Sequence, residues 1–412
     1  MVDIPSGGDP STTWYQPFAA ANLFCAGHAF NREGRLMVVG GQLATDYYEG
    51  TTQAVFFDSL GGNVWSVPAN CTMAEPRWYP TVIPLANGEI LAIGGTRYNE
   101  QDPNKVPEVW QTAGGWRRLT TASKAVPFYP WAFQAPNGKV FLAGNWPKTF
   151  YLDTSGTGRW TAGPTRNYAN RSYGSVVMYD TGRILALGGG NPATATAEWI
   201  DLRAKTPKWR TTASMQYARR YPNATVLPDG KVLVTGGSAG PNDARVAAMT
   251  PEMWDPATGK WGSMAPMQVP RLYHSSAVLL PDGRVLSAGG GRPASKHGVE
   301  NFNAEIYSPP YLFRGPRPVI AASPSRIGFG SRCTVQIDAA RPITMVNLIR
   351  LSSATHCFNM GQRFLRLAFS AGSGGLSVTG PASGKIAPPG HYLLHVVDDD
   401  GVPSEGAIVQ VG

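Results

Sequence analysis

The sequence predicts an all-β protein in which a bladed propeller is followed by a smaller β-sandwich domain. The 412 residues include 48 Gly, 35 Pro and 12 Trp, and only 15% of them are charged. This composition suits many short strands joined by turns better than long helices. A second observation is a glycine spacing of 44 to 54 residues along the first three quarters of the chain. Repeats of that length are typical of propeller blades.

The repeat is defined by two glycines. The turn glycines are Gly34, Gly88, Gly138, Gly182, Gly230 and Gly283. A second glycine follows each of them after six residues, at Gly40, Gly94, Gly144, Gly188, Gly236 and Gly289. Between the two glycines lies a strand such as "KVLVTGG". Since the offset is the same in all six repeats, we interpret them as equivalent strands of successive blades.

Segments between the repeats complete each blade. In "PEMWDPATGKWGSM" a short strand, a turn and a tryptophan-bearing strand follow one another, which is the kelch pattern of a four-stranded blade. Blades cannot bury their faces alone, so they pack around an axis, and equivalent positions form rings about it. We therefore expect residues 1–312 to form a kelch-type propeller.

The kelch pattern stops near Tyr311, where the Pro-rich stretch "RGPRPVIAASPS" begins. Beyond it, "RCTVQID", "HYLLHVV" and "GAIVQVG" alternate as strands do, and about a hundred residues suit an immunoglobulin-like β-sandwich. We expect this second domain to cover residues 313–412.

Charge and hydropathy exclude several classes of function. The formal charge is +9, but the basic residues are scattered and never exceed pairs, so we expect no nucleic-acid partner. No apolar run is long enough for a membrane span, and the first twenty residues lack the pattern of a signal peptide. The four cysteines do not form a disulfide scaffold; Cys333 and Cys357 are expected either to be joined or to be free thiols.

One ring position stands nine residues before each turn glycine. Tyr79, Tyr129, Tyr173 and Tyr221 occupy it, so a tyrosine here is first of all a packing residue of the repeat. The first repeat departs from the rule because it places Cys25 at this offset. A cysteine is therefore predicted to lie beside Tyr79 on the ring.

The sixth repeat contains "PRLYHSS", in which Tyr273 stands ten residues before Gly283. We interpret this as one inserted residue, which would form a β-bulge and turn both Tyr273 and His274 toward the axis. A further ligand is expected from "SSATHCFNMGQRFL" in the second domain, where His356 lies in a polar loop that could reach the propeller axis.

Four motifs in this order resemble the copper-radical oxidases, the family of galactose oxidase and glyoxal oxidase. They are "NLFCAG", "PRWYP", "PRLYHSSAVLLPDGR" and "THCFNMGQR", and the resemblance extends over nearly all of residues 20–412. The "RWY" form is nearer to the glyoxal oxidase branch. The resemblance implies that Tyr79, Tyr273, His274 and His356 bind one copper ion. It also implies a thioether between Cys25 and Tyr79.

The resemblance further implies an activity. A primary alcohol or hydrated aldehyde would be oxidised by O2 to an aldehyde or acid, with hydrogen peroxide as the second product. Tyr273 would accept the substrate proton, and a radical on the cross-linked Tyr79 would remove a hydrogen atom from the substrate carbon. The substrate would be a small alcohol, aldehyde or carbohydrate. Secretion and a monomeric state are expected on the same ground.

The chain also departs from the family pattern. Arg97 stands where galactose oxidase has a tryptophan over the cross-linked tyrosine, so Trp146 is a candidate to cover the radical instead. Arg97 is expected either to contact an acidic or polyhydroxy substrate or to lie on the surface. His28 either lines the pocket or packs. The family has seven blades and six repeats are visible, so residues 1–20 could supply closing strands, or the ring could have six blades or a gap.

Two other functions stay open. A non-catalytic kelch propeller could bind a glycan or a protein partner, or a degenerate relative could bind copper without turnover. Cys25 favours the oxidase over the binding module, because a binding module has no reason to replace the tyrosine of the repeat by cysteine.

Overall fold

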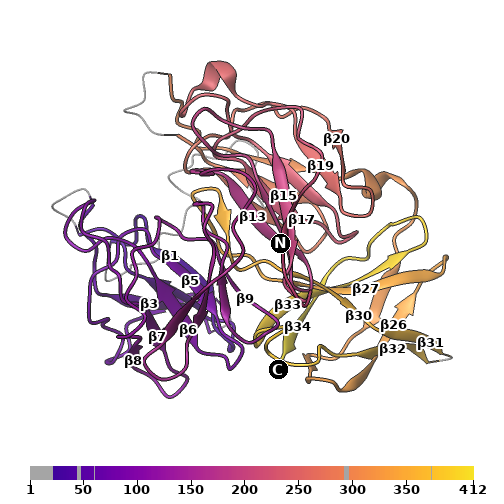
Figure 1. Ribbon diagram of the computed structural model, residues 1–412. Coiled ribbons are helices and arrows are strands. Elements are labelled where there is room, and N and C mark those ends of the chain that lie inside the picture. The colour runs from indigo at the N-terminus through magenta and orange to yellow at the C-terminus, as the bar shows by residue number, and fades with distance from the viewer. Residues whose placement is uncertain (1–21, 44–47, 60, 292–296, 373) are drawn as a thin grey trace.

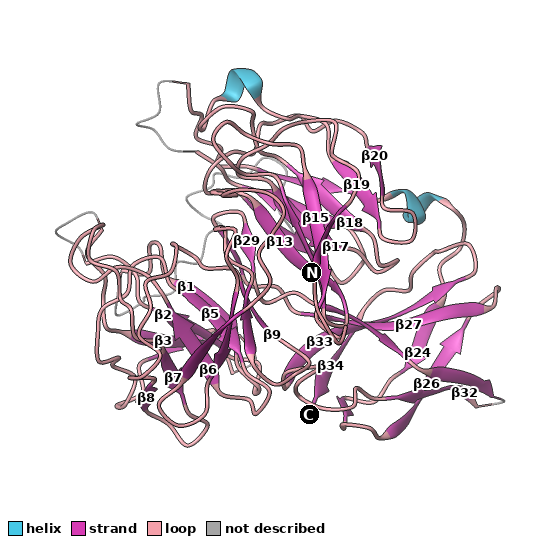
Figure 2. Cartoon of the chain, viewed as in Figure 1, coloured by secondary structure: helices cyan, strands magenta, loops and turns pink. Residues whose placement is uncertain are grey.

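The computed structural model describes residues 22–43, 48–59, 61–291, 297–372 and 374–412 (Figure 1). These residues form strands and loops almost throughout (Figure 2), which confirms the predicted all-β class. The described helices are two short 3-10 turns, η1 (Ala244–Val246) and η2 (Pro310–Phe313), and no helix of the described residues is long and apolar enough to cross a membrane.

The propeller strands pair in sequence order within antiparallel sheets. The first sheet is β1 (Gly27–Phe30), β2 (Leu36–Val39), β3 (Ala54–Asp58) and β4 (Val64–Ser66). The second is β5 (Thr81–Pro84), β6 (Ile90–Ile93), β7 (Glu108–Trp110) and β8 (Trp116–Arg118). The third is β9 (Ala132–Gln134), β10 (Val140–Leu142), β11 (Phe150–Asp153) and β12 (Arg159–Ala162).

The later blades follow the same plan. The fourth is β13 (Ser175–Asp180), β14 (Arg183–Leu187), β15 (Ala197–Asp201) and β16 (Trp209–Thr211). The fifth is β17 (Asn223–Val226), β18 (Val232–Thr235), β19 (Glu252–Asp255) and β20 (Lys260–Ser263). The sixth is described with three strands, β21 (Ser276–Leu279), β22 (Val285–Ala288) and β23 (Ala304–Tyr307). The closing strands expected from residues 1–20 lie outside the described residues.

Ion pairs of a buried arginine recur in four of the blades. In each, an arginine two or three residues before the ring position reaches a glutamate on the third strand, in the pairs Arg77–Glu108, Arg171–Glu198, Arg219–Glu252 and Arg271–Glu305. Each arginine also donates to the carbonyl of the second repeat glycine, as Arg219 does to Gly236 O at 2.8 Å. These contacts tie the segment that carries the ring residue to the rest of its blade.

The second domain is a sandwich of two sheets with its own core. One sheet is β24 (Val319–Ala322), β26 (Arg332–Asp338), β32 (Gly375–Thr379) and β31 (Phe369–Gly372). The other is β25 (Arg326–Ile327), β34 (Ala407–Val411), β33 (Gly390–Asp398), β27 (Ile343–Arg350) and β30 (Phe364–Leu367). The predicted boundary between residues 312 and 313 lies in the connection from β23 to β24.

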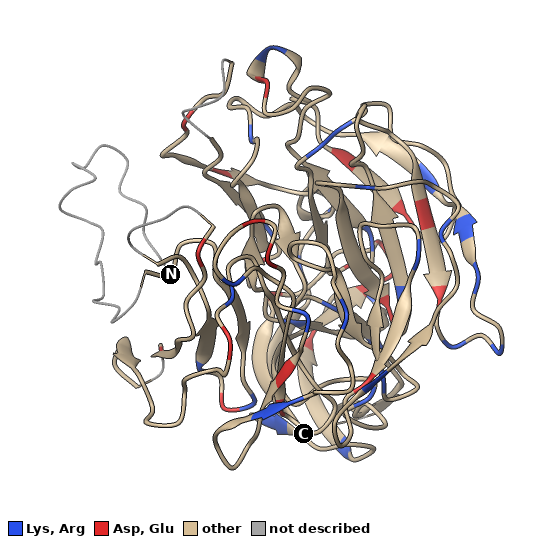
Figure 3. Cartoon of the chain, turned by 60° about the vertical axis from the view of Figure 1, so that its left-hand side comes forward, with Lys and Arg blue, Asp and Glu red and all other residues tan. Residues whose placement is uncertain are grey.

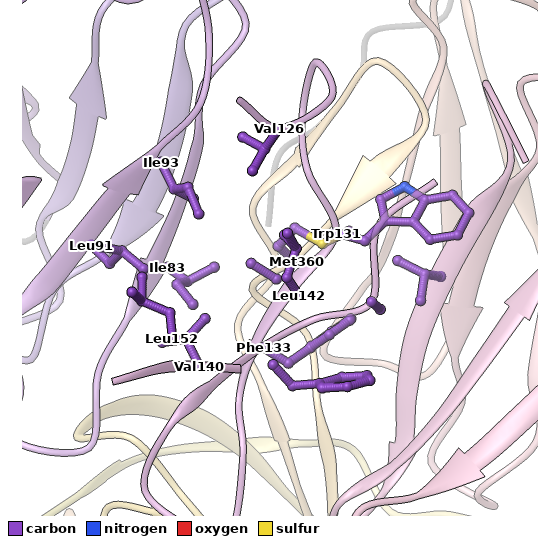
Figure 4. Packing of buried hydrophobic residues seen from close by; sticks show 14 of the residues in the cluster. Ile83, Leu91, Ile93, Val126, Trp131, Phe133, Val140, Leu142, Leu152 and Met360 are labelled. Atoms are coloured by element: carbon purple, nitrogen blue, oxygen red, sulfur yellow. The ribbon is translucent and has the colours of Figure 1, made fainter. Parts of the chain in front are cut away.

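A hairpin of the second domain enters the centre of the propeller. It consists of β28 (Ala354–Thr355) and β29 (Phe358–Asn359), and Figure 4 shows the following Met360 among propeller side chains such as Leu142 and Trp131. Gln362 then bonds the inner strand β17 twice: its Nε2 donates to Ala224 O at 2.7 Å, and its Oε1 accepts from Val226 N at 3.0 Å. The residues between β28 and β29 are thereby held near the propeller axis.

Charged side chains are spread over the molecule. In its view, Figure 3 shows blue and red segments interspersed on the propeller and on the sandwich. This distribution agrees with the scattered basic residues of the sequence.

Candidate metal centre

The ring position has a left-handed backbone in every repeat. The φ angles are 62° at Cys25, 62° at Tyr79, 42° at Tyr129, 59° at Tyr173, 61° at Tyr221 and 69° at His274. His274 stands nine residues before Gly283, so it holds the ring place of the sixth blade. Backbone hydrogen bonds link ring residues of neighbouring blades, as the bond donated by Tyr79 N to Cys25 O at 3.0 Å does. Tyr273 therefore occupies the position just before the ring.

The β-bulge predicted for the sixth repeat is wrong. His274 has the nine-residue offset and the left-handed backbone of the other ring residues, and β21 and β22 pair in continuous register from Ser276 with Ala288 to Leu279 with Val285, so no extra residue lies between the ring place and Gly283. The positive φ at His274 breaks the alternation of a regular strand instead. The rings of Tyr273 and His274 lie 3.9 Å apart, inclined by 31°, and both face the same centre.

Four side chains meet at this centre, namely Tyr79, Tyr273, His274 and His356. The hydroxyl groups of Tyr79 and Tyr273 form a short hydrogen bond. The ring of His356 lies 4.6 Å from that of His274 and 4.9 Å from that of Tyr79, measured between centroids. Tyr79, Tyr273 and His356 are buried. The structure thus brings together all four residues that the resemblance assigns to copper.

Hydrogen bonds orient the two imidazoles. His274 Nδ1 donates to Gly291 O at 2.8 Å, since a carbonyl can only accept, so the lone pair of this ring lies on Nε2. His356 Nδ1 lies 2.7 Å from the Thr355 hydroxyl, and its Nε2 lies 3.5 Å from Cys25 Sγ. Two imidazole nitrogens and two phenol oxygens form the N,O donor set that suits Cu(II). The residues fit a copper ion.

Burial dominates the electrostatics of the centre. It raises the pKa of Tyr79 well above its usual value and raises the pKa of the Cys25 thiol to about 12. Burial, followed by the neighbouring His274, lowers the pKa of His356 well below its usual value. These pKa shifts favour the neutral imidazole of His356, the form that binds a metal, and a bound cation would favour the ionised phenol of Tyr79.

Trp78 packs closely on Tyr79. Their ring centroids lie 3.8 Å apart at 44°, and Phe128 approaches Tyr79 at 5.6 Å. Trp146, which the sequence suggested for this place, lines the neighbouring cavity instead. The "RWYP" motif contained the signal for this contact, because its tryptophan directly precedes the ring residue Tyr79, just as Tyr273 directly precedes the ring residue His274.

The two remaining candidate residues lie outside the centre. Arg97 forms ion pairs with Asp102 at 2.7 Å and with Glu75 at 3.2 Å, and it is not among the residues that line the cavity. His28 lies on β1, where burial lowers its pKa to about 4. It borders a small separate pocket with Thr355 and Phe358.

Sequence reasoning gave Cys357 no role, but the structure places it beside the centre. Its Sγ lies 3.5 Å from Ser275 Oγ and 3.7 Å from Leu272 O, and it packs with Tyr221 against Tyr273. The four cysteines are free thiols, which rules out the Cys333–Cys357 disulfide considered above.

A cavity of about 440 Å³ opens onto Tyr79 and Tyr273. Its lining residues are Tyr79, Glu100, Gln101, Pro103, Ala125, Val126, Pro127, Phe128, Tyr129, Asn145, Trp146, Ser172, Tyr173, Tyr273 and Phe358. A volume of this size accommodates a small organic molecule. The cavity therefore leads from the surface to the two phenols of the centre.

Comparison with known proteins extends over both domains. Residues 186–311 match the family model "Glyoxal oxidase N-terminus", and residues 317–411 match "Galactose oxidase-like, Early set domain". The chain is 30% identical to an aldehyde oxidase GLOX of Vitis pseudoreticulata, over 95% of this chain and 82% of that protein. It is 28% identical to a galactose oxidase of Gibberella zeae over 100% of this chain, but spans only 64% of the length of that relative.

A solved structure shares the whole architecture. A fungal alcohol oxidase of the AA5 family, determined in complex with copper, superimposes with a TM-score of 0.85 and 29% identity, over 95% of this chain and 86% of the other. The motifs, the convergence of two tyrosines and two histidines and these similarities agree. The chain belongs to the galactose oxidase and glyoxal oxidase family of copper-radical oxidases.

Proposed function

We propose that the protein is a copper-dependent oxidase of primary alcohols or hydrated aldehydes. Tyr79, Tyr273, His274 and His356 would hold one copper ion, as their donor atoms and convergence suggest. When bound, the copper would supply a Lewis acid that favours the ionised phenols and a centre that exchanges one electron.

A thioether between Cys25 Sγ and the Tyr79 ring would complete the site. Its formation removes one hydrogen from the thiol and one from the ring, and O2 takes up the two electrons. The shared burial of both residues and the Tyr79 N to Cys25 O bond support this link, because they hold the two side chains together before it forms. Sulfur donates electron density to the ring, so the linked Tyr79 is easier to oxidise than a free phenol.

Tyr273 and Tyr79 would have different roles in the reaction. Tyr273 Oη accepts the proton of the substrate hydroxyl, since it lies at the cavity floor within hydrogen-bonding reach of Tyr79. The oxidised Tyr79 accepts a hydrogen atom from the substrate carbon. Trp78 and Phe128 shield Tyr79 from water, which protects a radical from side reactions. Overall, two electrons and two protons pass from the substrate to O2 and give hydrogen peroxide.

The observation that carries this proposal is the meeting of the two phenols with His274 and His356, which come from the two domains. A glycan-binding or protein-binding propeller requires no such arrangement, and it explains neither the buried Cys25 nor the oriented imidazole of His274. The geometry therefore favours the oxidase over the binding module.

The test is peptide mapping after metal-free protein is incubated with copper in air. The peptides of Cys25 and Tyr79 should become joined with the loss of two hydrogens, and Cys25→Ala should remain unlinked. Peroxide release should then accompany alcohol or aldehyde oxidation. A protein that binds copper yet stays unlinked and releases no peroxide would show that the centre is not a radical oxidase.

A further inference from the structure

The cavity above Tyr79 and Tyr273 has walls rich in aromatic side chains. Seven of its fifteen lining residues carry aromatic rings, namely Tyr79, Phe128, Tyr129, Trp146, Tyr173, Tyr273 and Phe358. Pro103, Ala125, Val126 and Pro127 add further apolar surface. Such walls offer a flat apolar ligand a large contact area, together with edge and face contacts to its ring.

Charge is scarce in the lining. Among the described residues, Glu100 is the one charged residue of the lining, and this side chain is exposed at the surface. No lysine or arginine of the described residues lines the cavity, and Arg97 is already paired with Asp102 and Glu75. A carboxylate substrate would meet the negative charge of Glu100 and no cationic partner, so the cavity disfavours anions.

The polar groups of the described lining are four phenol hydroxyls, the indole N–H of Trp146 and the side chains of Glu100, Gln101, Asn145 and Ser172, while most of its accessible surface is apolar. Gln101 is exposed like Glu100, and the side-chain amide oxygen of Asn145, Oδ1, is buried away from water. Each sugar hydroxyl that loses water without gaining a partner costs free energy, so a polyhydroxy ligand fits this lining poorly.

Two aromatic side chains stand out because they face the cavity while remaining partly exposed. Trp146 is 42% exposed and Tyr173 is 39% exposed. Tyr173 is held in place by the Arg220 guanidinium, 4.9 Å from its ring centre, and by Tyr221 at 4.9 Å. Large aromatic surface that is kept exposed at a cavity is typical of a ligand platform.

From these observations we propose that the enzyme selects uncharged aryl alcohols and hydrated aryl aldehydes. This inference rests on the proposed function and names its substrate class. The hydroxyl group reaches the Tyr273 end, while the aryl ring lies toward Trp146 and Tyr173. An aryl alcohol ArCH2OH and O2 then give ArCHO and H2O2, with two electrons and two protons transferred.

The first experiment compares substrates on the copper-loaded, cross-linked enzyme. Benzyl alcohol should exceed cyclohexylmethanol, galactose and glycolate in kcat/KM, each by about tenfold or more. A preference for galactose, glycolate or glyoxal would overturn the aryl specificity and leave the oxidase proposal intact. Cross-linked enzyme that releases no peroxide from any of these compounds would overturn the proposed function itself.

Variants locate the specificity. Trp146→Leu should raise KM for benzyl alcohol about tenfold with kcat nearly unchanged, whereas Trp65→Leu, on the outer strand of the first blade, should change neither. Glu100→Gln should raise kcat/KM for glycolate several-fold relative to kcat/KM for benzyl alcohol. If Trp146→Leu behaves like Trp65→Leu, the aryl ring does not bind where we place it.

A binding measurement is independent of turnover. Saturation-transfer NMR on metal-free protein should detect benzyl alcohol, and the signal should weaken in Trp146→Leu but not in Trp65→Leu. Equal signals from the two variants would contradict the aromatic platform even if both enzymes were active.

Discussion

At the scale of single residues, Tyr273 and His274 occupy two adjacent positions of the blade repeat. His274 fills the ring place with a left-handed backbone, and Tyr273 fills the place before it, which Trp78 fills in the second blade. One tyrosine at the ring position and one before it can thus meet across the axis, as the bond between Tyr79 and Tyr273 shows.

Replacing Tyr273 by Phe tests its role in proton transfer. Because the group that accepts the substrate proton is lost while its packing is kept, kcat should fall by about 100-fold or more. Steady-state peroxide release measures this loss, and Tyr179→Phe in the fourth blade is the matched control. Activity within a factor of two of the wild type would show that another group takes the proton.

Cys357 is expected to act as a positioning residue. Its thiol contacts Leu272 O and Ser275 Oγ on either side of Tyr273 and His274, while its own backbone follows His356. Cys357→Ala should therefore weaken copper binding about tenfold, as the loss of a partner outside the ligands does. Competition with a chelator measures this affinity. The control is Cys71→Ala, which removes a thiol equally buried in the first blade.

If the two cysteine variants lose similar stability and both keep wild-type copper affinity, then Cys357 only fills space. A shift of the tyrosine-to-copper absorption band in Cys357→Ala alone would instead confirm that the thiol sets the geometry of Tyr273. The band reports on the ligand rather than on packing, so it separates the two roles.

At the scale of elements, the β28–β29 hairpin decides whether the site exists, since it brings His356 from the second domain. The hairpin is anchored by Gln362, whose side-chain amide forms two hydrogen bonds with the backbone of β17, one through its nitrogen and one through its oxygen. The sequence predicted a polar loop that reaches the axis, and the structure explains how the loop is fixed there.

Gln362→Leu should destabilise the protein because two buried backbone groups lose their partner. A cost of about 2–4 kcal/mol in the free energy of unfolding follows from two unsatisfied buried groups. Urea unfolding measures this cost, with Gln216→Leu on the surface as control. A loss no larger than that of the control would mean that water replaces the amide and that the hairpin is anchored by apolar packing alone.

At the scale of the whole molecule, buried histidines couple folding to pH. Burial lowers the pKa of His395, within the sandwich, from 6.5 to about 4. Below pH 6.5 the imidazole of His395 binds a proton in the unfolded chain but not in the folded chain, so the free energy of unfolding falls as the pH drops toward 4. The slope from this residue is about 1.4 kcal/mol per pH unit.

Urea unfolding of the metal-free protein between pH 4.5 and pH 7 measures the slope. His395→Gln should reduce the slope of the free energy of unfolding against pH by about 1.4 kcal/mol per pH unit over this range, although the absolute stability of the variant will differ. An unchanged slope in the variant would show that His395 titrates alike in both states.

The sequence by itself determined the blade repeat and the two-domain order, because fixed offsets from turn glycines survive in the linear chain, and the resemblance of its motifs to the copper-radical oxidases supplied the candidate ligands. Cys25 could be placed beside Tyr79 from the same fixed offsets. Only the tertiary structure decided that Trp78 packs on Tyr79, that Cys357 packs against Tyr273 and that aromatic side chains line the approach. The last two arrangements join segments far apart in the chain, and the packing of the adjacent Trp78 and Tyr79 depends on side-chain direction at a left-handed residue, which follows from backbone geometry.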